Sequence, residues 1–531
     1  MILDSEFVKM KSSSKVILNT GILYGKMLIT MGFSLYSTRL VLNALGASDY
    51  GIFDLIAGVI AMLSFLNAAM TTSTQRYLSF HQGTKDFEMQ KKIFTNSWIL
   101  HIAIGVIVVV LLLTLVPFLF GGFLNIPADN ISTAKIVYYF MSVSVFFTIM
   151  SVPFTASLNA HENMLWIAVV NIIESVIKLA IASSLLWFIQ SERLIVYGIL
   201  MAVLSIITFS LYVGFCLKKY NECNVRNYQI DTLLIKELGG FAGWNLFGAL
   251  CGLGRTQGLA VILNLFFGTV VNAAYGIANQ VSGQLSFFSQ TMLRAINPQI
   301  MKSEGMSDRQ RMLRLSMMAS KFGFFLMALV SIPCLFEMPA ILKLWLKKVP
   351  ENTAVFCSLV LVAVLMQQLT VGLMSALQAT GKIKAYQSIV GGILLLNLPI
   401  AYYLLKKGFP AYSVLISFIC IEFVACLFRL FLSKKNAGLS IKEYFSRVFF
   451  KEVIPIAMST ITCWLIVHCL NFEFRFFITG IISVIVLAIF IYISGLCKDE
   501  KIMVKVMIKK IFKDNGRKRT IYKQSIYRLF E

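Results

Sequence analysis

Long apolar runs, broken by short polar segments, follow one another along almost the whole chain. Each run has about the 20 residues that a helix needs to cross the hydrocarbon core of a bilayer. The runs predict fourteen helices, at 16–37, 50–70, 93–117, 134–157, 165–188, 194–216, 240–267, 272–295, 315–336, 354–376, 388–404, 411–432, 453–470 and 476–496. We therefore expect an all-α, polytopic integral membrane protein with fourteen transmembrane helices.

Composition supports this expectation and excludes other classes of protein. The 531 residues are 58% hydrophobic and only 14% charged, whereas soluble domains have about 25% charged residues. A soluble enzyme, a disordered chain and a fibrous repeat are excluded. The short polar segments leave no room for a large soluble catalytic domain.

The basic residues set the expected orientation. The net charge is +23, and cytoplasmic loops of membrane proteins collect Lys and Arg. With the N-terminus inside, 36 Lys and Arg fall in cytoplasmic segments and 8 in outside loops. We expect a multi-pass protein of the cytoplasmic (inner) membrane with both termini cytoplasmic. The first apolar run is too long for a signal-peptide core and is expected to remain as the first helix.

The basic tail, 497–531, is expected to lie on anionic lipid. It carries no recognisable nucleic-acid-binding module, so no nucleic-acid partner is expected. The ten cysteines contain no Cys-x-x-Cys pair, and the four histidines have no metal-ligand spacing. We expect no metal and no cofactor, and interpret the cysteines as small buried side chains.

A weak internal repeat divides the chain into two halves. Leu42-Asn43-Ala44-Leu45-Gly46 precedes Tyr50-Gly51-Ile52, and Leu263-Asn264-Leu265 with Gly268 precedes Tyr275-Gly276-Ile277. Six helices separate the copies, so the halves run in the same direction. This predicts two parallel-repeat lobes with a cleft between them: a first lobe (1–217), a cytoplasmic linker (218–239), a second lobe (240–432), helices 13 and 14 (433–496) and the tail (497–531).

Five ionisable residues fall at mid-helix, where charge is costly and commonly functional. They are Lys26, Glu174, Lys178, Arg255 and Glu422. Glu174 and Lys178 are four residues apart and can pair, as a structural pair or in a cavity. Lys26 and Arg255 have no acid at i±3 or i±4, which favours a water-filled cavity. The net positive charge suits an anionic headgroup.

Polar rows accompany these charges. Asn19, Lys26, Thr30 and Ser37 share one face of the first helix, and Asn171, Glu174, Ser175 and Lys178 share one face of the fifth. A row through Asn279 on the eighth helix either contacts a hydroxylated ligand or only joins helices. Glu422 is a protonated acid, a counter-charge or a proton-coupling site, and Arg39 either binds substrate or extends to the interface.

Several motifs resemble those of polysaccharide flippases. They are Thr38-Arg39-Leu40-Val41-Leu42-Asn43-Ala44-Leu45-Gly46 with Asp49-Tyr50-Gly51-Ile52, Thr74-Gln75-Arg76-Tyr77-Leu78, Tyr275-Gly276-Ile277-Ala278-Asn279-Gln280-Val281 through Asn297-Pro298-Gln299, and Leu377-Gln378-Ala379-Thr380-Gly381. The order of the motifs resembles the O-antigen and capsule (Wzx-like) branch of the multidrug/oligosaccharidyl-lipid/polysaccharide exporter superfamily, over about residues 15–500.

The resemblance implies an alternating-access transporter that moves polyprenyl-diphosphate-linked oligosaccharide to the outer leaflet, with a polysaccharide polymerase as a further partner. Lys26, Arg39 and Arg255 then occupy positions comparable to cavity arginines of related flippases. We expect Lys26 and Arg255, one on each lobe, to bind the diphosphate, with Lys178 and Asn279 lining the path and Glu174 and Glu422 as counter-charges or ion-coupling groups.

Two alternatives remain. An ion-coupled multidrug/cation antiporter of the same fold typically uses an acid on the first helix, yet no Asp or Glu lies between Val16 and Ser37. A membrane enzyme needs outside loops that build a site, whereas the longest outside loop expected here, Glu337–Thr353, has no His. No nucleophile–base set or ATP-binding motif is present.

Overall fold

The structure is a computed structural model of the chain. It describes residues 2–502 except 62–63, 125, 188–191, 225–229, 347–348, 471 and 473. Within this part every regular element is a helix. Most of the basic tail predicted at 497–531 lies outside the described residues, because the description ends at residue 502.

The first lobe consists of the helices up to residue 219. They are α1 (Ile2–Ala61), α2 (Ser64–Gly83), α3 (Phe87–Phe118), α4 (Ile131–Met150), α5 (Val152–Ala160), α6 (Met164–Trp187) and α7 (Arg193–Lys219). A π-helical turn, η1 (Leu119–Phe123), extends α3, and two short 3₁₀ turns, η2 (Ala128–Asn130) and η3 (Asn221–Cys223), precede α4 and follow α7.

The second lobe and the appended pair follow. The lobe contains α8 (Thr232–Gly305), α9 (Arg309–Trp345), α10 (Thr353–Gln368), α11 (Val371–Ala379), α12 (Ile383–Leu395), α13 (Asn397–Lys406) and α14 (Ser413–Ala437). The appended pair is formed by α15 (Ile441–Tyr444), η4 (Phe445–Phe449) and α16 (Phe450–Cys469), then α17 (Arg475–Phe490) and η5 (Ile491–Gly495). The linker predicted at 218–239 is already helical from Thr232.

Eleven stretches of the described residues are long and apolar enough to cross a membrane. This confirms a polytopic all-α membrane protein and is consistent with fourteen helices. The first and second predicted helices fall within α1 and α2, and the seventh and eighth fall within α8. The predicted end of the eighth helix, residue 295, was too early, since α8 continues to Gly305.

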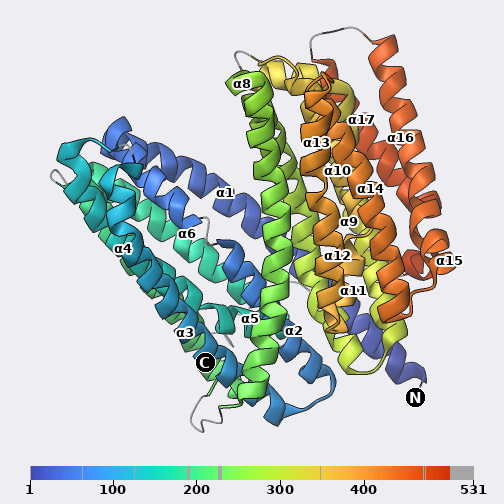
Figure 1. Cartoon of the computed structure of the whole chain (residues 1–531). Coiled ribbons are helices and arrows are strands. Elements are labelled where there is room, and N and C mark those ends of the chain that lie inside the picture. Colours follow the sequence, from blue (N-terminus) through green and yellow to red (C-terminus); the bar gives the residue numbers. More distant parts are fainter. Residues whose placement is uncertain are drawn as a thin grey trace.

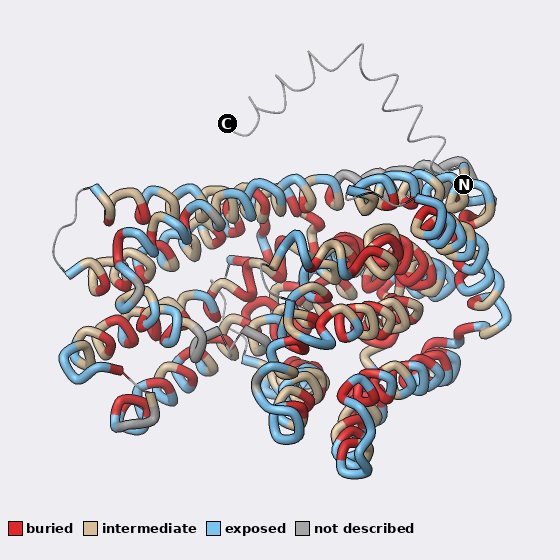
Figure 2. The backbone as a smooth tube through the Cα atoms, turned by 90° about the horizontal axis from the view of Figure 1, so that it is seen from above, coloured by how far each residue is buried: buried red, intermediate tan, exposed pale blue. Residues whose placement is uncertain are grey.

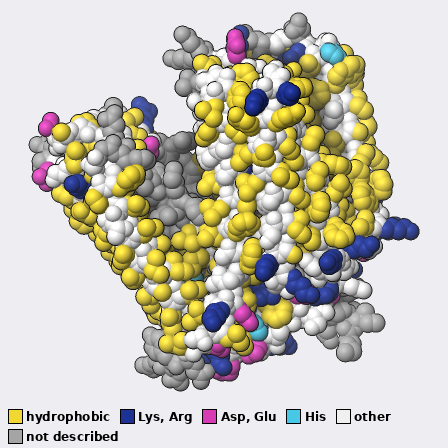
Figure 3. Space-filling model, in the orientation of Figure 1, with side chains coloured by type: hydrophobic (Ala, Val, Ile, Leu, Met, Phe, Trp, Pro, Cys, Tyr) yellow, Lys and Arg dark blue, Asp and Glu magenta, His cyan; other side chains and the backbone are white. Residues whose placement is uncertain are grey.

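The two lobes lean against each other at one end and separate toward the other, forming a V (Figure 1). Buried residues lie mainly on the helix sides that face one another, and exposed residues lie around the outside (Figure 2). Hydrophobic side chains cover the flanks of both lobes (Figure 3). The end at which the lobes meet is called the closed end below, and the opposite end the open end.

The internal repeat is visible in the backbone at two glycines. Gly46 interrupts α1 with φ 76° and ψ 171°, and Gly268 interrupts α8 with φ 74° and ψ −164°. A residue with a Cβ rarely adopts such a positive φ, so glycine is the residue suited to these turns. Both breaks lie where the repeated sequence motifs place them, between the first and second helix of each half.

A second pair of glycines lies 37 residues further on in each half, at Gly83 and Gly305. A Cβ on Gly83 would overlap the carbonyl oxygen of Lys302, and one on Gly305 would overlap the carbonyl oxygen of Phe80. The ends of α2 and α8 therefore cross with backbone against backbone at the closed end. Small residues allow this close approach of helices in membranes.

The appended pair is fixed to α9 by a buried acid. Glu337 accepts two hydrogen bonds from Arg475, at 2.8 and 3.1 Å, and one from Thr479 at 2.9 Å. Ser459 and Ser483 join α16 to α17 at 2.8 Å. The outside loop expected at Glu337–Thr353 was wrong at its start, because α9 bends at Glu337 and stays helical to Trp345. The partner at Arg475 explains why an acid is placed here.

The glycine crossing gives the first prediction. We expect Gly305→Ala to lower the stability by about 1–3 kcal/mol, as overpacking of a tight contact does, because the new methyl group overlaps the backbone of α2. The apparent melting temperature of the purified protein in detergent measures this change.

Gly276→Ala is the matched control for this prediction. Gly276 is exposed on the same helix, and a Cβ there meets no atom within 4 Å. Its stability should stay unchanged or rise by up to about 1 kcal/mol. Equal melting temperatures for the two variants would contradict the crossing.

Candidate functional site

A cavity of about 520 Å³ opens between α1, α6, α7 and α8. This volume lies within the range of ligand sites, about 300–1,000 Å³. Most of its lining comes from the first lobe, and Gln284 and Phe287 come from α8. The polar and charged lining residues are Lys26, Thr30, Ser34, Ser37, Thr38, Tyr50, Asn171, Glu174, Ser175, Lys178, Tyr197 and Gln284.

The two polar rows predicted on the first and fifth helices meet in this cavity. Lys26, Thr30 and Ser37 approach it from α1, and the row from Asn171 to Lys178 approaches from α6. The Lys178 ammonium donates to Glu174 Oε1 at 2.6 Å, and the Ser37 hydroxyl donates to the carbonyl oxygen of Lys178 at 3.4 Å. Glu174 and Lys178 thus form the expected pair and also line the cavity.

Lys26 keeps the character that the sequence predicted. Its side chain is half-buried and has no hydrogen bond or ion pair with a described residue. Arg294 of α8 lies close enough for the two positive charges to repel each other. Arg294 is itself exposed and has no partner within the described part of the chain. Glu174 also lies close enough to attract Lys26, so the lysine has one cation, Arg294, and one acid, Glu174, in its surroundings.

Sequence reasoning missed Arg294 because the eighth helix was ended at residue 295, which made Arg294 a residue of the interface. The available signal was the helical pattern that continues from Gly268 through Pro298 to Gly305. In that longer helix Arg294 lies well before the end, as α8 shows.

Arg255 lies in a different environment, and the expectation that it is an unpaired cation was wrong. Its guanidinium donates to Glu422 Oε2 at 3.1 Å and stacks on the ring of Phe418 at 4.0 Å. Arg429 donates to the other carboxylate oxygen of Glu422 at 2.7 Å. The side chains of Arg255 and Glu422 are only 11% and 1% exposed. Arg255 is thus a buried ion-pair partner inside the second lobe.

The same cluster decides between the interpretations of Glu422. Two guanidinium groups hold its carboxylate, which identifies it as a counter-charge. A carboxylate so held is a poor ligand for a further cation, because both oxygens already accept charged hydrogen bonds. Its role in ion coupling, and any role of Arg255 in substrate binding, stay predictions.

The two remaining predicted residues lie outside the cavity lining. Arg39 is exposed on α1, with no hydrogen bond to the described residues, as expected for a side chain that extends to the interface. Asn279 bonds to the side chain of Tyr275 on its own helix. The structure brings neither of them to Lys26.

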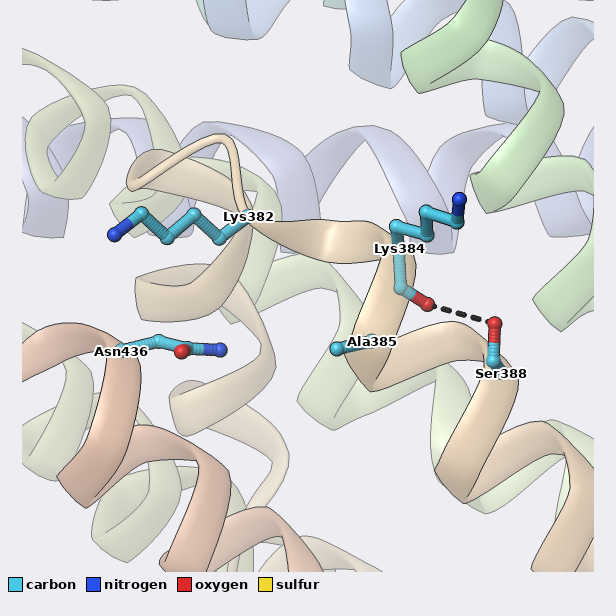
Figure 4. Close-up of a pocket in the computed structure, with 5 residues that line it drawn as sticks. All are labelled: Lys382, Lys384, Ala385, Ser388 and Asn436. Atoms are coloured by element: carbon cyan, nitrogen blue, oxygen red, sulfur yellow. Dashed lines mark hydrogen bonds between the residues drawn. The ribbon is translucent and has the colours of Figure 1, made fainter.

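A second pocket, of about 450 Å³, lies at the closed end between α12 and α14 (Figure 4). Lys382, Lys384, Ala385, Ser388 and Asn436 line it. The two lysine side chains point to opposite sides, and Ser388 donates to the carbonyl oxygen of Lys384. Because its charges do not converge, this pocket is the weaker candidate.

Among the described residues no group of three His, Cys, Asp or Glu could hold a metal ion. The ten cysteines are free, and most of them are buried.

Residues 23–183 match the family described as MatE. A search of curated proteins finds no match. Among solved structures, a MATE protein in the bent conformation has a TM-score of 0.71 at 12% identity, over 80% of this chain and 96% of that chain. An outward-facing multidrug resistance MATE family transporter of the MOP superfamily has a TM-score of 0.69 at 12% identity, with the same coverage of both chains.

A third structure is a MOP superfamily transporter from Pyrococcus furiosus, whose description reports a binding pocket of reverse polarity and suggests a different function. It has a TM-score of 0.69 at 12% identity, again over 80% of this chain and 96% of that one. The chain thus has the fold of MATE and MOP superfamily transporters, which are membrane transporters rather than enzymes. These likenesses fit the alternative, a multidrug/cation antiporter, better than the expected polysaccharide flippase.

The Arg255–Glu422–Arg429 cluster gives the second prediction. Glu422→Gln leaves two buried guanidinium groups without their counter-charge. Breaking a buried ion pair in this way costs about 3–5 kcal/mol, so we expect a marked fall in the melting temperature in detergent.

Cys420→Ser, an exposed change on the same helix, should leave the melting temperature almost unchanged. The double variant Arg255→Gln with Glu422→Gln should be less destabilised than the sum of the single variants. Full additivity would show that the pair is not formed.

Proposed function

We propose that this protein transports an anionic substrate across the membrane by alternating access between its two lobes. In its finer form, the proposal is that the substrate is a polyprenyl-diphosphate-linked oligosaccharide. The observation that carries it is Lys26, a cation that lines the cavity and makes no hydrogen bond or ion pair with a described residue. Arg294 of α8 lies close enough to repel this lysine, and Glu174 lies close enough to attract it.

The charge of the cavity supports an anion over a cation. Lys178 and Glu174 cancel as a pair, so Lys26 leaves the cavity lining with an excess of one positive charge, and Arg294 on α8 adds a second cation nearby. An unpaired cation at bilayer depth is costly and needs water or an anion. A cationic drug would add to this excess, whereas a diphosphate would remove it.

The same two charges suggest how binding favours closure of the cleft. With the cleft empty, Lys26 on α1 and Arg294 on α8 repel each other. An anion between them turns this repulsion into two attractions across the lobes. The ligand then binds more tightly when the lobes are close together than when they are apart. Such a difference in affinity is what shifts a conformational equilibrium.

The expected orientation assigns the open end. The loops that the charge distribution places in the cytoplasm, such as the one between α2 and α3, lie at the closed end (Figure 1). With this orientation the V opens to the outside. The inner membrane, the cytoplasmic termini, the contact of the tail with anionic lipid and a polymerase partner belong to this proposal.

An ion-coupled multidrug/cation antiporter is the second candidate. The matched family and the solved MATE transporters favour it, and Glu174 supplies an acid in the cavity. That acid is bonded to Lys178 at 2.6 Å, and no Asp or Glu among the described residues lines the cavity from α1. The polarity of the site therefore favours the anion, and transport measurements decide.

The third prediction tests the two cations. The full protein in vesicles is given a fluorescent polyprenyl-diphosphate oligosaccharide, and its leaflet is followed with an impermeant quencher. Lys26→Gln and Arg294→Gln should each slow translocation about 10-fold or more, since a hydrogen bond to a charged group contributes about 1.5–3 kcal/mol.

Lys406→Gln removes an exposed cation at the open end of α13 and is the matched control, with translocation expected at the parental rate. Normal transport by the Lys26→Gln/Arg294→Gln double variant would refute the cation site. The antiporter would be established by proton-driven uptake of a cationic dye that is lost in Glu174→Gln, together with no translocation of the lipid-linked oligosaccharide.

A cellular measurement tests the substrate class. In cells without the protein, complete lipid-linked repeat units should accumulate on the inner leaflet. If Arg294→Gln reproduces the accumulation, the cation site and the flippase are both supported. If no lipid-linked intermediate accumulates, the flippase is wrong.

A further inference from the structure

Three of the sequence motifs lie at the closed end rather than at the cavity. They are Thr74–Leu78 on α2, Asn297–Gln299 on α8 and Leu377–Gly381 at the end of α11. Contacts between the lobes join them to each other and to the turn between α5 and α6. The proposed transport leaves them without a role.

Glu162, in the turn between α5 and α6, reaches from the first lobe to α8. Its Oε1 accepts from the Lys302 ammonium at 2.6 Å, and its Oε2 accepts from the Gln299 amide at 2.5 Å. The side chain of Glu162 is 3% exposed and that of Lys302 is 20% exposed. Glu162 has φ 59°. This backbone conformation is strained for a residue with a side chain, and it persists only where the surrounding structure holds it.

Arg76 makes the second contact between the lobes. Its guanidinium donates to the carbonyl oxygen of Ala379 at 3.2 Å and lies against the backbone of Gly381. A Cβ on Gly381, which has φ 77°, would be 2.8 Å from the guanidinium nitrogen. The first-lobe motif thus binds the turn formed by the second-lobe motif, beside the crossing of Gly83 and Gly305.

α1 connects these contacts to the cavity. The Asn19 amide donates to the backbone carbonyl oxygen of Glu162 at 3.0 Å. Lys26 lies seven residues further on the same face of α1, about 10 Å along the helix at 1.5 Å per residue. The polar row of α1 therefore begins at the Glu162 turn and continues into the cavity lining.

We propose that Glu162, with Lys302 and Gln299, forms a latch that keeps the closed end shut, and that Asn19 ties this latch to the cavity through α1. Arg76 and the turn at Gly381 form the second half of the same closure. Opening this end separates Glu162 from α8 and admits water to both charged groups.

The chemistry of the latch suits a reversible closure. A buried ion pair loses hydration when it forms, and its net contribution is small compared with the cost of leaving one partner buried alone. Separation of the lobes hydrates both partners together, so neither is left buried alone. The latch thus holds the closed end without making its opening prohibitively costly.

The fourth prediction concerns the two distances between the lobes, measured by pulsed electron paramagnetic resonance on the full chain in detergent. Cys420 and Cys469, which are exposed, are first replaced by Ser. Spin labels at Glu88→Cys and Lys435→Cys report the closed end, and labels at Asp129→Cys and Glu351→Cys report the open end. Glu162→Gln should increase the population with a long closed-end distance at least about fivefold, the low end of conformational couplings.

Two variants separate a latch from a loss of folding. Glu222→Gln is the matched control, because this buried acid bonds His161 and Ser157 within the first lobe and linker. It should leave both distance distributions unchanged. The charge reversal Glu162→Lys with Lys302→Glu should restore the parental distribution. An unchanged distribution in Glu162→Gln, or an equal change in Glu222→Gln, overturns the latch.

The link through Asn19 rests on the proposed anion site and is tested separately with inorganic pyrophosphate. We expect pyrophosphate to change the closed-end distance in the parent protein and to have at least about fivefold less effect in Asn19→Ala. An equal effect in both overturns the link. No effect in the parent overturns the link together with the anion site, whereas the latch is decided by the Glu162 variants alone.

Discussion

The cost of a charge in hydrocarbon determines where the ionisable residues of this chain lie. A charged group at bilayer depth needs a partner, water or both. Inside the second lobe and at its edges the requirement is met by pairing, as Glu422 with Arg255 and Arg429, Glu337 with Arg475, and Lys321 with Glu500 at 2.5 Å. Lys26, which lines the cavity, and Arg294 form no such ion pair with any described residue. The contrast identifies the site more clearly than any single residue does.

The internal repeat determines how the two lobes meet. Each half has one glycine that breaks its long first helix and a second glycine 37 residues later that crosses the other half. The crossing at Gly83 and Gly305 brings the lobes into backbone contact at one end only.

Local patterns in the sequence were enough for the all-helical class, the repeat and the polar faces, but not for the helix ends, since α8 continues to Gly305. The rows through Lys26 on α1 and Glu174 on α6 were predicted from their helical spacing, and the structure brings both into one cavity. Arg255 was misjudged because the search for a partner covered only i±3 and i±4. Its partner Glu422 is 167 residues away, and Arg429 lies seven residues from Glu422, outside the same window. Pairing between helices depends on packing, which spacing along one helix does not contain.

Likeness of fold and polarity of the site differ in what they can decide about the substrate. The fold is shared at 12% identity with a multidrug resistance MATE family transporter and also with a MOP transporter whose pocket polarity is described as reversed. One backbone therefore accommodates pockets of either sign, and likeness of fold does not choose between a cation and an anion. The sign of the charge at the cavity does distinguish them, because a further positive charge brought beside Lys26 must overcome its repulsion. The polarity of the cavity, rather than the fold, is therefore the basis of the proposed anionic substrate.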